Sequence, residues 1–329
     1  MKPLLIPLLL VAFSLIMGGC SAMGPKMPPL ASIEGVPGHF AEGRIIDLHN
    51  GKSISFDELM DDLQKADLIF VGEVHDNPEH HLIEVQILQE LTARYGPLNV
   101  AMEFFDTTQQ PALDRYVKEG ISETLFLEDV NWAKAWSFPY HFYRPLVFSA
   151  KEKGNRLMGI NLPSSIVRKV ARSGIESLTP EERGHAAEEI DLNNEAHRQY
   201  LSEVFKDHQQ GELRNFDYFY QAQCVWEDTM ARNIARYLKE DPRRMVVFSG
   251  NGHIIERFGI PNRVLRRMPA KMATLLLYPL TERRILNKNM ADYVWLTSGC
   301  SAGRHDHRSM RLRKLGEKDK NENITGKDR

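Results

Sequence analysis

The segment of residues 67–84, DLIFVGEVHDNPEHHLIE, constrains the fold of this chain more than any other. Residues 68–71 form a short, entirely apolar run, which is typical of a strand buried on both faces of a sheet. A glycine ends the run, and a cap residue followed by proline then predicts a helix over residues 79–94. Glu73 and His75 therefore lie at the carboxyl end of a predicted parallel strand, where open α/β sheets form their ligand crevices.

The same alternation of short apolar runs and helical patterns continues along the chain. Further strands are predicted at residues 98–105, 155–161, 245–249, 273–278 and 293–296, and helices at 140–153, 164–172, 179–190, 194–208 and 216–240. An Asn-Gly pair between apolar runs predicts a hairpin at 44–55. Together these patterns indicate an α/β fold, a mostly parallel sheet with helices on both faces. The mostly polar residues 164–210 predict a helical cap or arm inserted over the sheet.

The first twenty residues predict a lipoprotein signal peptide. Lys2 precedes the apolar residues 3–17, a run too short to be interpreted first as a membrane span. The run closes on two glycines and Cys20, which is similar to a bacterial lipobox, in which the cysteine is lipidated. We expect acyl chains such as palmitate on Cys20 and, because Ser21 follows, an outer-membrane location. Plain secretion with a chance cysteine is the alternative.

Composition sets the remaining boundaries. Residues 21–43 carry several Pro and Gly and predict a tether, residues 44–302 the folded domain, and residues 303–329 a disordered charged tail. The formal net charge of −2 gives no reason to expect a nucleic-acid partner. Two cysteines remain in the mature chain: Cys224 is expected in the core, and a bridge between Cys224 and Cys300 stays open.

Four polar residues are predicted to gather at the ends of three strands. Glu73 and His75 follow the first strand, Glu103 ends the next, and His253 follows the strand at 245–249. Two carboxylates and two imidazoles could hold a divalent metal, or a carboxylate could orient a histidine for general-base catalysis. The alternative is that Glu103 and His253 are structural polar groups satisfied by loop backbone.

Two other clusters allow two interpretations each. His80 and His81 share a helix face with Glu84, either as an exposed polar face or beside the site. A dense aromatic and basic segment contains Trp132, Trp136, Phe138, Tyr140, His141, Tyr143 and Arg144. This segment is either a core patch or a flat apolar pocket in which phenol and imidazole groups could act as axial ligands to ferric iron.

Several segments together resemble the ChaN-like haem-binding lipoproteins. They are VGEVHDNPEHH (71–81), AMEFF (101–105), the Trp132–Tyr143 segment followed by GINLP (159–163), QAQCVWEDTMARNIARYL (221–238) and SGNGHI (249–254). The superfamily of these proteins also contains the Tiki proteases and the erythromycin esterases. The resemblance implies an iron-regulated role in haem uptake at the outer membrane, with an outer-membrane haem receptor among the expected partners.

The resemblance also implies a mode of haem binding. In the family, two haems bind face to face between two subunits, so we expect a homodimer on haem binding, with a tyrosine on each iron. Position in the aromatic segment identifies Tyr143 as the expected iron ligand and Tyr140 as its rival. His75 or His141 is the expected partner of the haem propionates, with Arg144 near these carboxylates.

The related enzymes leave a second function open. They use the matching histidines and acidic residues for catalysis, and here these are Glu73, His75, Glu103 and His253. The resemblance therefore allows a metal-dependent or His-catalysed hydrolase, a peptidase or an esterase, beside the haem-binding protein. A third hypothesis is that the protein is a scaffold lipoprotein whose arm at 164–210 binds a receptor.

Overall fold

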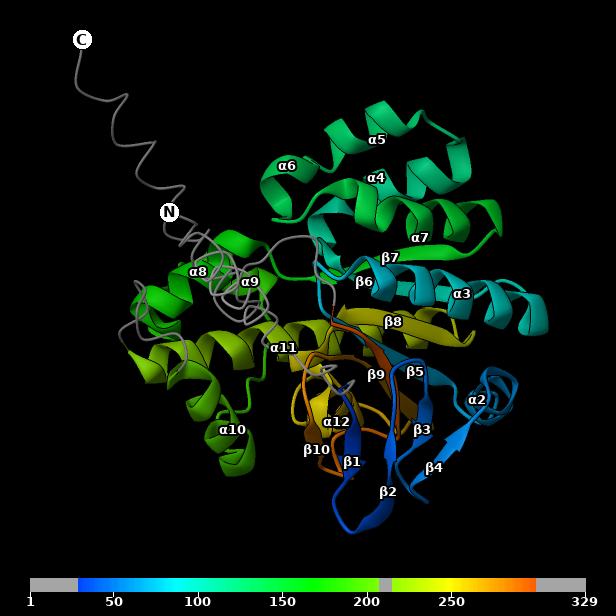
Figure 1. The fold of residues 1–329 in the computed structure, drawn as a ribbon. Helices are drawn as coiled ribbons and strands as arrows, with labels where there is room; N and C mark the ends of the chain where they lie inside the picture. Colours follow the sequence, from blue (N-terminus) through cyan, green and yellow to red (C-terminus); the bar gives the residue numbers. More distant parts are fainter. Residues whose placement is uncertain (1–28, 207–214, 300–329) are drawn as a thin grey trace, which may run out of the picture.

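A large, mostly parallel sheet forms the centre of the computed structural model, which describes residues 29–206 and 215–299 (Figure 1). Within these residues its strand order is β4 (Lys52–Ile54), β3 (Ile45–Asp47), β11 (Tyr293–Ser298), β9 (Met272–Leu280), β5 (Leu68–Glu73), β8 (Met245–Gly250), β6 (Asn99–Asp106) and β7 (Arg156–Asn161). The strands from β11 to β7 pair in parallel, and β3 and β4 add an antiparallel hairpin at one edge. The predicted α/β fold is confirmed.

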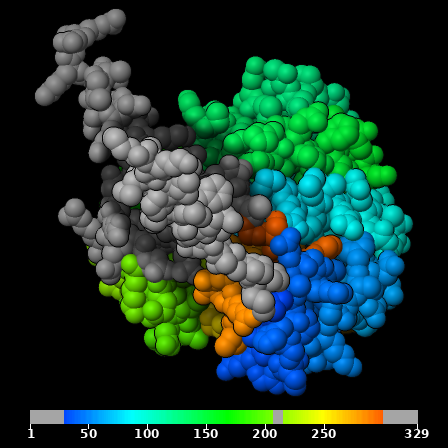
Figure 2. Space-filling view, in the orientation of Figure 1, coloured from blue at the N-terminus to red at the C-terminus, as the bar shows by residue number. Residues whose placement is uncertain are grey.

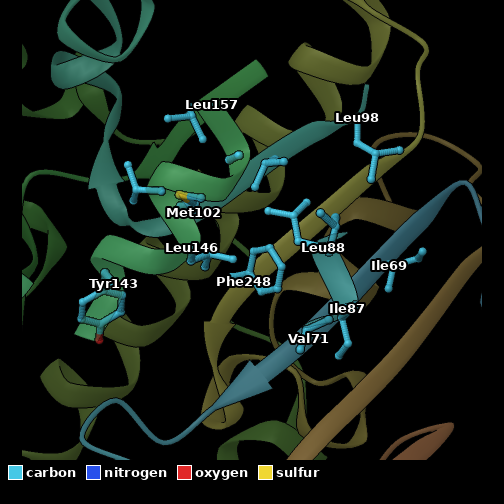
Figure 3. Packing of buried hydrophobic residues seen from close by; sticks show 14 of the residues in the cluster. Ile69, Val71, Ile87, Leu88, Leu98, Met102, Tyr143, Leu146, Leu157 and Phe248 are labelled. Carbon is cyan, nitrogen blue, oxygen red and sulfur yellow. The ribbon is translucent and has the colours of Figure 1, made fainter. Parts of the chain in front are cut away.

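Both faces of this sheet are covered by helices. One face carries α2 (Phe56–Leu63), α3 (Pro78–Tyr95) and α7 (Tyr140–Glu152), and the other carries α11 (Phe216–Glu240) and α12 (Ile260–Leu265). Along β5, Ile69 and Val71 pack on the first face, and Leu68 and Phe70 pack on the second. Because both sets are fully buried, the strand reads in the sequence as a continuous apolar run. Figure 3 shows Ile69 and Val71 beside residues of α3, with Phe248 of β8 nearby.

A group of short elements lies between β6 and α7. It consists of η1 (Thr107–Gln109), α4 (Gln110–Asp114), the π-helical turn η2 (Arg115–Glu119), α5 (Glu123–Asp129) and α6 (Trp132–Ala135). Its buried aromatic residues, among them Tyr116 and Phe126, extend the core of the first face beyond the sheet. In Figure 2 this green region and the cyan α3 form a continuous surface.

The predicted helical arm is present and has its own apolar core. It comprises α8 (Ser164–Ser173), η3 (Ile175–Ser177), α9 (Pro180–His185) and α10 (Glu195–Lys206), which pack on the first half of α11. The helix predicted over 179–190 ends earlier, at His185. The backbone N–H of Ala187 donates instead to Thr229 on α11, and that of Asp191 donates to Asp228. Tertiary hydrogen bonds thus replace the last helical turns.

The tether predicted over residues 21–43 is wrong for its second half. A small sheet has the order β10 (Arg284–Leu286), β1 (Ala31–Ile33) and β2 (Val36–Phe40), with Gly35 at positive φ in the turn. Ala31 and Ile33 are buried, and β1 pairs with β10, which lies some 250 residues later in the sequence. The Pro and Gly residues of this segment therefore shape a turn and an edge strand, not a tether.

Several predictions fall outside the described residues. These are the signal peptide, Cys20 and Ser21, the start of the tether, Cys300 and the tail at 303–329. Cys224 is buried as expected, as a free thiol in contact with Arg263. In the part of the chain that the structure describes, none of the helices combines the length and apolar character that crossing a bilayer requires.

Candidate functional site

The site lies where β5, β8 and β6 end side by side in the sheet. β8 separates the other two strands, so Glu73 of β5, Glu103 of β6 and His253 of η4 (Asn251–His253) reach the same carboxyl edge. His75 comes from the loop after β5 and faces β8 closely: a Cβ at Gly250 would lie 2.9 Å from its Nε2. The structure thus brings the four predicted strand-end residues together.

Glu73 and His75 form a hydrogen-bonded pair. The distance from His75 Nδ1 to Glu73 Oε1 is 2.5 Å, and Glu73 is buried while the His75 side chain is 13% exposed. The rings of Trp136 and Phe138 lie 5.2 and 5.1 Å from the imidazole. Within the described residues Nε2 takes part in no hydrogen bond. A carboxylate that orients one ring nitrogen and leaves the other accessible suits acid–base chemistry or the binding of a carboxylate ligand.

His81 and Glu84 extend this pair along α3. His81 Nδ1 lies 2.9 Å from Glu73 Oε2 and 3.3 Å from Glu84 Oε2, while its Nε2 lies 3.1 Å from the carbonyl oxygen of His75. These two residues therefore belong beside the site. His80 does not, because its Nδ1 accepts from the Val74 amide and its Nε2 pairs with a threonine hydroxyl of β11.

The charges of these buried groups are interdependent. Burial alone would raise the pKa of Glu73, but His81 and His75 outweigh it and hold the pKa well below the usual range. Burial would lower the pKa of His81, but Glu73 and Glu84 raise it to about 11. Burial and the Glu73 charge raise the pKa of Glu84 to about 8. In the absence of other ions, the cluster at neutral pH holds one imidazolium, one carboxylate and one protonated carboxyl group.

A second histidine lies between two carboxylates on the other side of β8. His253 Nδ1 is 3.1 Å from Glu227 Oε1, and its Nε2 is 3.6 Å from Glu103 Oε1. Glu103 also accepts the N–H of Gly250 at 2.7 Å. Burial would lower the pKa of His253, but the two carboxylates outweigh it and raise the pKa to about 9. At neutral pH His253 is therefore an imidazolium that holds Glu103 in place.

Glu227 on α11, which contacts His253, and the side chains that surround Glu227 were not predicted from the sequence. Glu227 Oε2 lies 3.3 Å from Arg263 Nε and 3.6 Å from His197 Nε2, and Arg263 also pairs with Asp228. All of these side chains are buried. The available signal was the Glu227-Asp228 pair inside an otherwise apolar stretch of a helix, since carboxylates at such positions are buried only with partners.

The two candidate tyrosines point to different places. The Tyr143 hydroxyl is fully buried, 3.3 Å from Glu73 Oε1 and 3.4 Å from the carbonyl oxygen of His75. Burial and the Glu73 charge raise the pKa of Tyr143 well above its usual value. Figure 3 shows its hydroxyl turned away from the aliphatic residues of the core. Tyr140 instead packs on Trp132, and its buried hydroxyl has no hydrogen-bond partner within the described residues.

His141 and Arg144 are not brought to the site. Both lie on the exposed side of α7, whereas Tyr143 on the same helix faces inward. Arg144 donates to Glu123 of α5 at 2.8 Å, and the His141 ring packs on Phe142. In this arrangement neither side chain contacts the strand-end residues.

The residues present fit a haem group in their chemistry. His75 offers an accessible imidazole nitrogen beside two aromatic rings, and Tyr143 offers a phenol in contact with the His75 backbone. On α3, which also carries His81, the apolar side chain of Leu82 is 64% exposed. A planar apolar ligand with carboxylate groups requires such a combination of rings, apolar surface and one donor for its acid groups.

The match to a protein family agrees with this chemistry, and a solved structure shares the fold. Residues 59–264 match the family described as haem-binding uptake, Tiki superfamily, ChaN. The structure titled cofacial heme binding to ChaN of Campylobacter jejuni superimposes with a TM-score of 0.63 and 23% identity, covering 76% of this chain and 95% of that chain. An erythromycin esterase, the EreC mutant H289N in its open conformation, matches with a TM-score of 0.44 and 13% identity, covering 73% of this chain and 77% of that chain.

One curated relative is more distant. Protein RETICULATA-RELATED 5, chloroplastic, of Arabidopsis thaliana is 22% identical over 271 residues, which is 74% of this chain and 36% of that protein. The chain thus spans about a third of the length of the curated relative it matches. The family match covers well over half of the chain, including every strand that contributes to the site. The chain belongs to the ChaN family of haem-binding uptake proteins in the Tiki superfamily.

Proposed function

We propose that this protein binds haem in pairs at the interface of a homodimer, with Tyr143 as the iron ligand and His75 as a donor to a propionate. The observation that carries the assignment is the contact of the Tyr143 hydroxyl with Glu73 and the His75 backbone. This contact places the phenol at the one imidazole of the strand-end residues that is partly exposed. Tyr140, which lies against Trp132, is the weaker candidate.

Iron ligation by Tyr143 would need a rearrangement of this side chain. In the described conformation the phenol is buried and stays protonated, because burial and Glu73 raise its pKa. Ferric iron would supply the positive charge that stabilises the phenolate. We expect α7 to shift on haem binding, so that the phenol leaves Glu73 and His75 gains a carboxylate partner.

The proposed location and partners rest on sequence patterns alone. We propose that Cys20 carries the lipid anchor, that the protein resides at the outer membrane, and that an outer-membrane haem receptor exchanges haem with it. Labelling with a palmitate analogue tests the anchor. The expected result is incorporation into the wild type and none into Cys20→Ser, and equal labelling of both would overturn it.

A haemin titration tests the ligand assignment. Absorbance of the purified protein should show saturable binding with the spectrum of tyrosinate-bound ferric haem, and the mass of the complex should double. Tyr143→Phe should abolish that spectrum, whereas Tyr140→Phe and the matched control Tyr95→Phe should keep it; Tyr95 lies at the far end of α3. Retention of the spectrum in Tyr143→Phe would reject Tyr143 as the ligand.

The Glu73–His75 pair supports a second candidate function, a His-catalysed hydrolase. The 2.5 Å contact orients His75 Nδ1 and leaves Nε2 open, which is the arrangement of a general base. Ester and peptide libraries test it. Hydrolysis that disappears in His75→Asn and persists in His141→Asn would support this function, and equal rates in all three proteins would exclude it.

A further inference from the structure

A second cluster next to His75 has the composition of a metal site. Glu73, His81 and Glu84 each offer one ligand atom, and these atoms lie within 4.8 Å of one another. Glu73 ends β5, while His81 and Glu84 are three residues apart on α3, so two rigid elements fix the three side chains. All three side chains are buried, so bulk water does not compete with them for a bound ion.

The histidine is oriented as a metal ligand would be. His81 Nε2 lies 3.1 Å from the carbonyl oxygen of His75, to which it donates its proton. Once an ion displaces the proton from Nδ1, the Nδ1 lone pair faces Oε2 of Glu73 and Oε2 of Glu84, which lie 2.9 and 3.3 Å away. Metal-binding histidines in general donate their other ring N–H to a carbonyl or carboxylate in this way.

Histidines are the cationic partners of these two buried acids, and among the described residues no lysine or arginine forms an ion pair with either of them. Glu73 contacts His75, His81 and the Tyr143 hydroxyl, and Glu84 contacts His81 and Glu73. Glu84 is fully buried, and its Oε1 has no hydrogen-bond partner within that same part of the chain. An unpartnered carboxylate oxygen at this depth is costly unless a ligand satisfies it.

We propose that Glu73, His81 and Glu84 bind one divalent first-row transition ion, separate from haem iron. One imidazole and two carboxylates are a ligand set for ions such as Mn²⁺, Fe²⁺ or Zn²⁺, and a double positive charge balances the two carboxylates. Because Glu73 also contacts His75, the bound ion fixes the carboxylate that orients this imidazole. Binding of this ion does not depend on haem.

Cobalt provides the test, since Co²⁺ follows the same ligand preferences and has a visible spectrum. The purified full chain, stripped with EDTA and free of haem, is titrated with Co²⁺ and followed by absorbance and calorimetry. We expect one equivalent to bind and to be displaced by Zn²⁺. Glu84→Gln and His81→Gln should each weaken binding by more than about tenfold. Glu90→Gln is the matched control, because this glutamate lies on the same helix with its side chain 36% exposed.

Three outcomes would overturn the proposal. No bound Co²⁺ would mean that a shared proton, not a metal ion, holds the cluster together. Equal affinity in Glu84→Gln and the wild type would place the ion elsewhere. A stoichiometry or spectrum unchanged in His81→Gln would do the same, with circular dichroism confirming that each variant is folded. The haemin titration is read independently, so failure of one proposal is distinguishable from failure of the other.

Discussion

Raising the pH should destabilise the folded protein through the proton that His253 holds between Glu103 and Glu227. The folded pKa of about 9 lies about 2.5 units above the value of ~6.5 for an unfolded chain. Each unit corresponds to about 1.4 kcal/mol, so the imidazolium contributes roughly 3 kcal/mol to the free energy of unfolding. Because the folded pKa is raised, this contribution is complete below about pH 6.5 and is lost as the pH rises through about 9.

Urea unfolding at a series of pH values from about 6 to about 9.5 measures this loss. His81, with a folded pKa of about 11, changes stability in the same direction over this range. The share of His253 is therefore obtained from a variant, Glu227→Gln, which removes one of its two carboxylate partners. In this variant the slope of unfolding free energy near pH 8 should flatten by up to about 1.4 kcal/mol per pH unit, the effect of one proton.

The comparison rests on the slope, because Glu227→Gln also lowers the absolute stability through its lost contact with Arg263. Glu90→Gln, a solvent-accessible carboxylate on α3, is the control and should keep the wild-type slope. A wild-type stability that stays constant between about pH 7 and about pH 9 would refute the reasoning. So would identical slopes in Glu227→Gln and the wild type.

Three further substitutions have defined outcomes. Ser55→Ala removes the capping box of α2 and should lower the free energy of unfolding by about 1 kcal/mol in urea; no change would mean that the cap is not formed. Phe248→Ala, in the fully buried centre of β8, should cost about 3–5 kcal/mol in the same assay. Gly250→Ala places a Cβ 2.9 Å from His75 Nε2 and should change the ¹⁵N imidazole signals of His75, whereas Gly184→Ala, with open space around its Cβ, should not.

The strands and long helices of the large sheet were predictable because each carries its own signal. Strands buried on both faces read as unbroken apolar runs, and α11 has the predicted bounds of residues 216–240 because a cap begins it and a proline follows it. The small sheet was not predictable. β1 has three residues and pairs with β10, and no local sequence pattern predicts pairing with a strand so far along the chain.

The candidate site could be predicted only in part, because some of its residues carry a local sequence signal and others do not. Glu73, Glu103 and His253 follow from strand ends, because the carboxyl ends of parallel strands share one edge. Glu227 reaches the site only because α11 packs on the second face of the sheet in a position that brings Glu227 to His253. Local sequence does not specify this packing. Likewise, the rotation of α7 decides that Tyr143 faces Glu73 while Arg144 faces solvent.

The place of β8 between β5 and β6 governs the order in which the site can form during synthesis. β6 ends at Asp106 and β8 begins only at Met245, so the ribosome releases β5 and β6 long before their common neighbour exists. Until then both strands present unpaired edges, which favour aggregation and attract chaperones. A chain cut before β8 keeps Glu73 and Glu103 but has no strand to align them, so assembly of the site is a late event of folding.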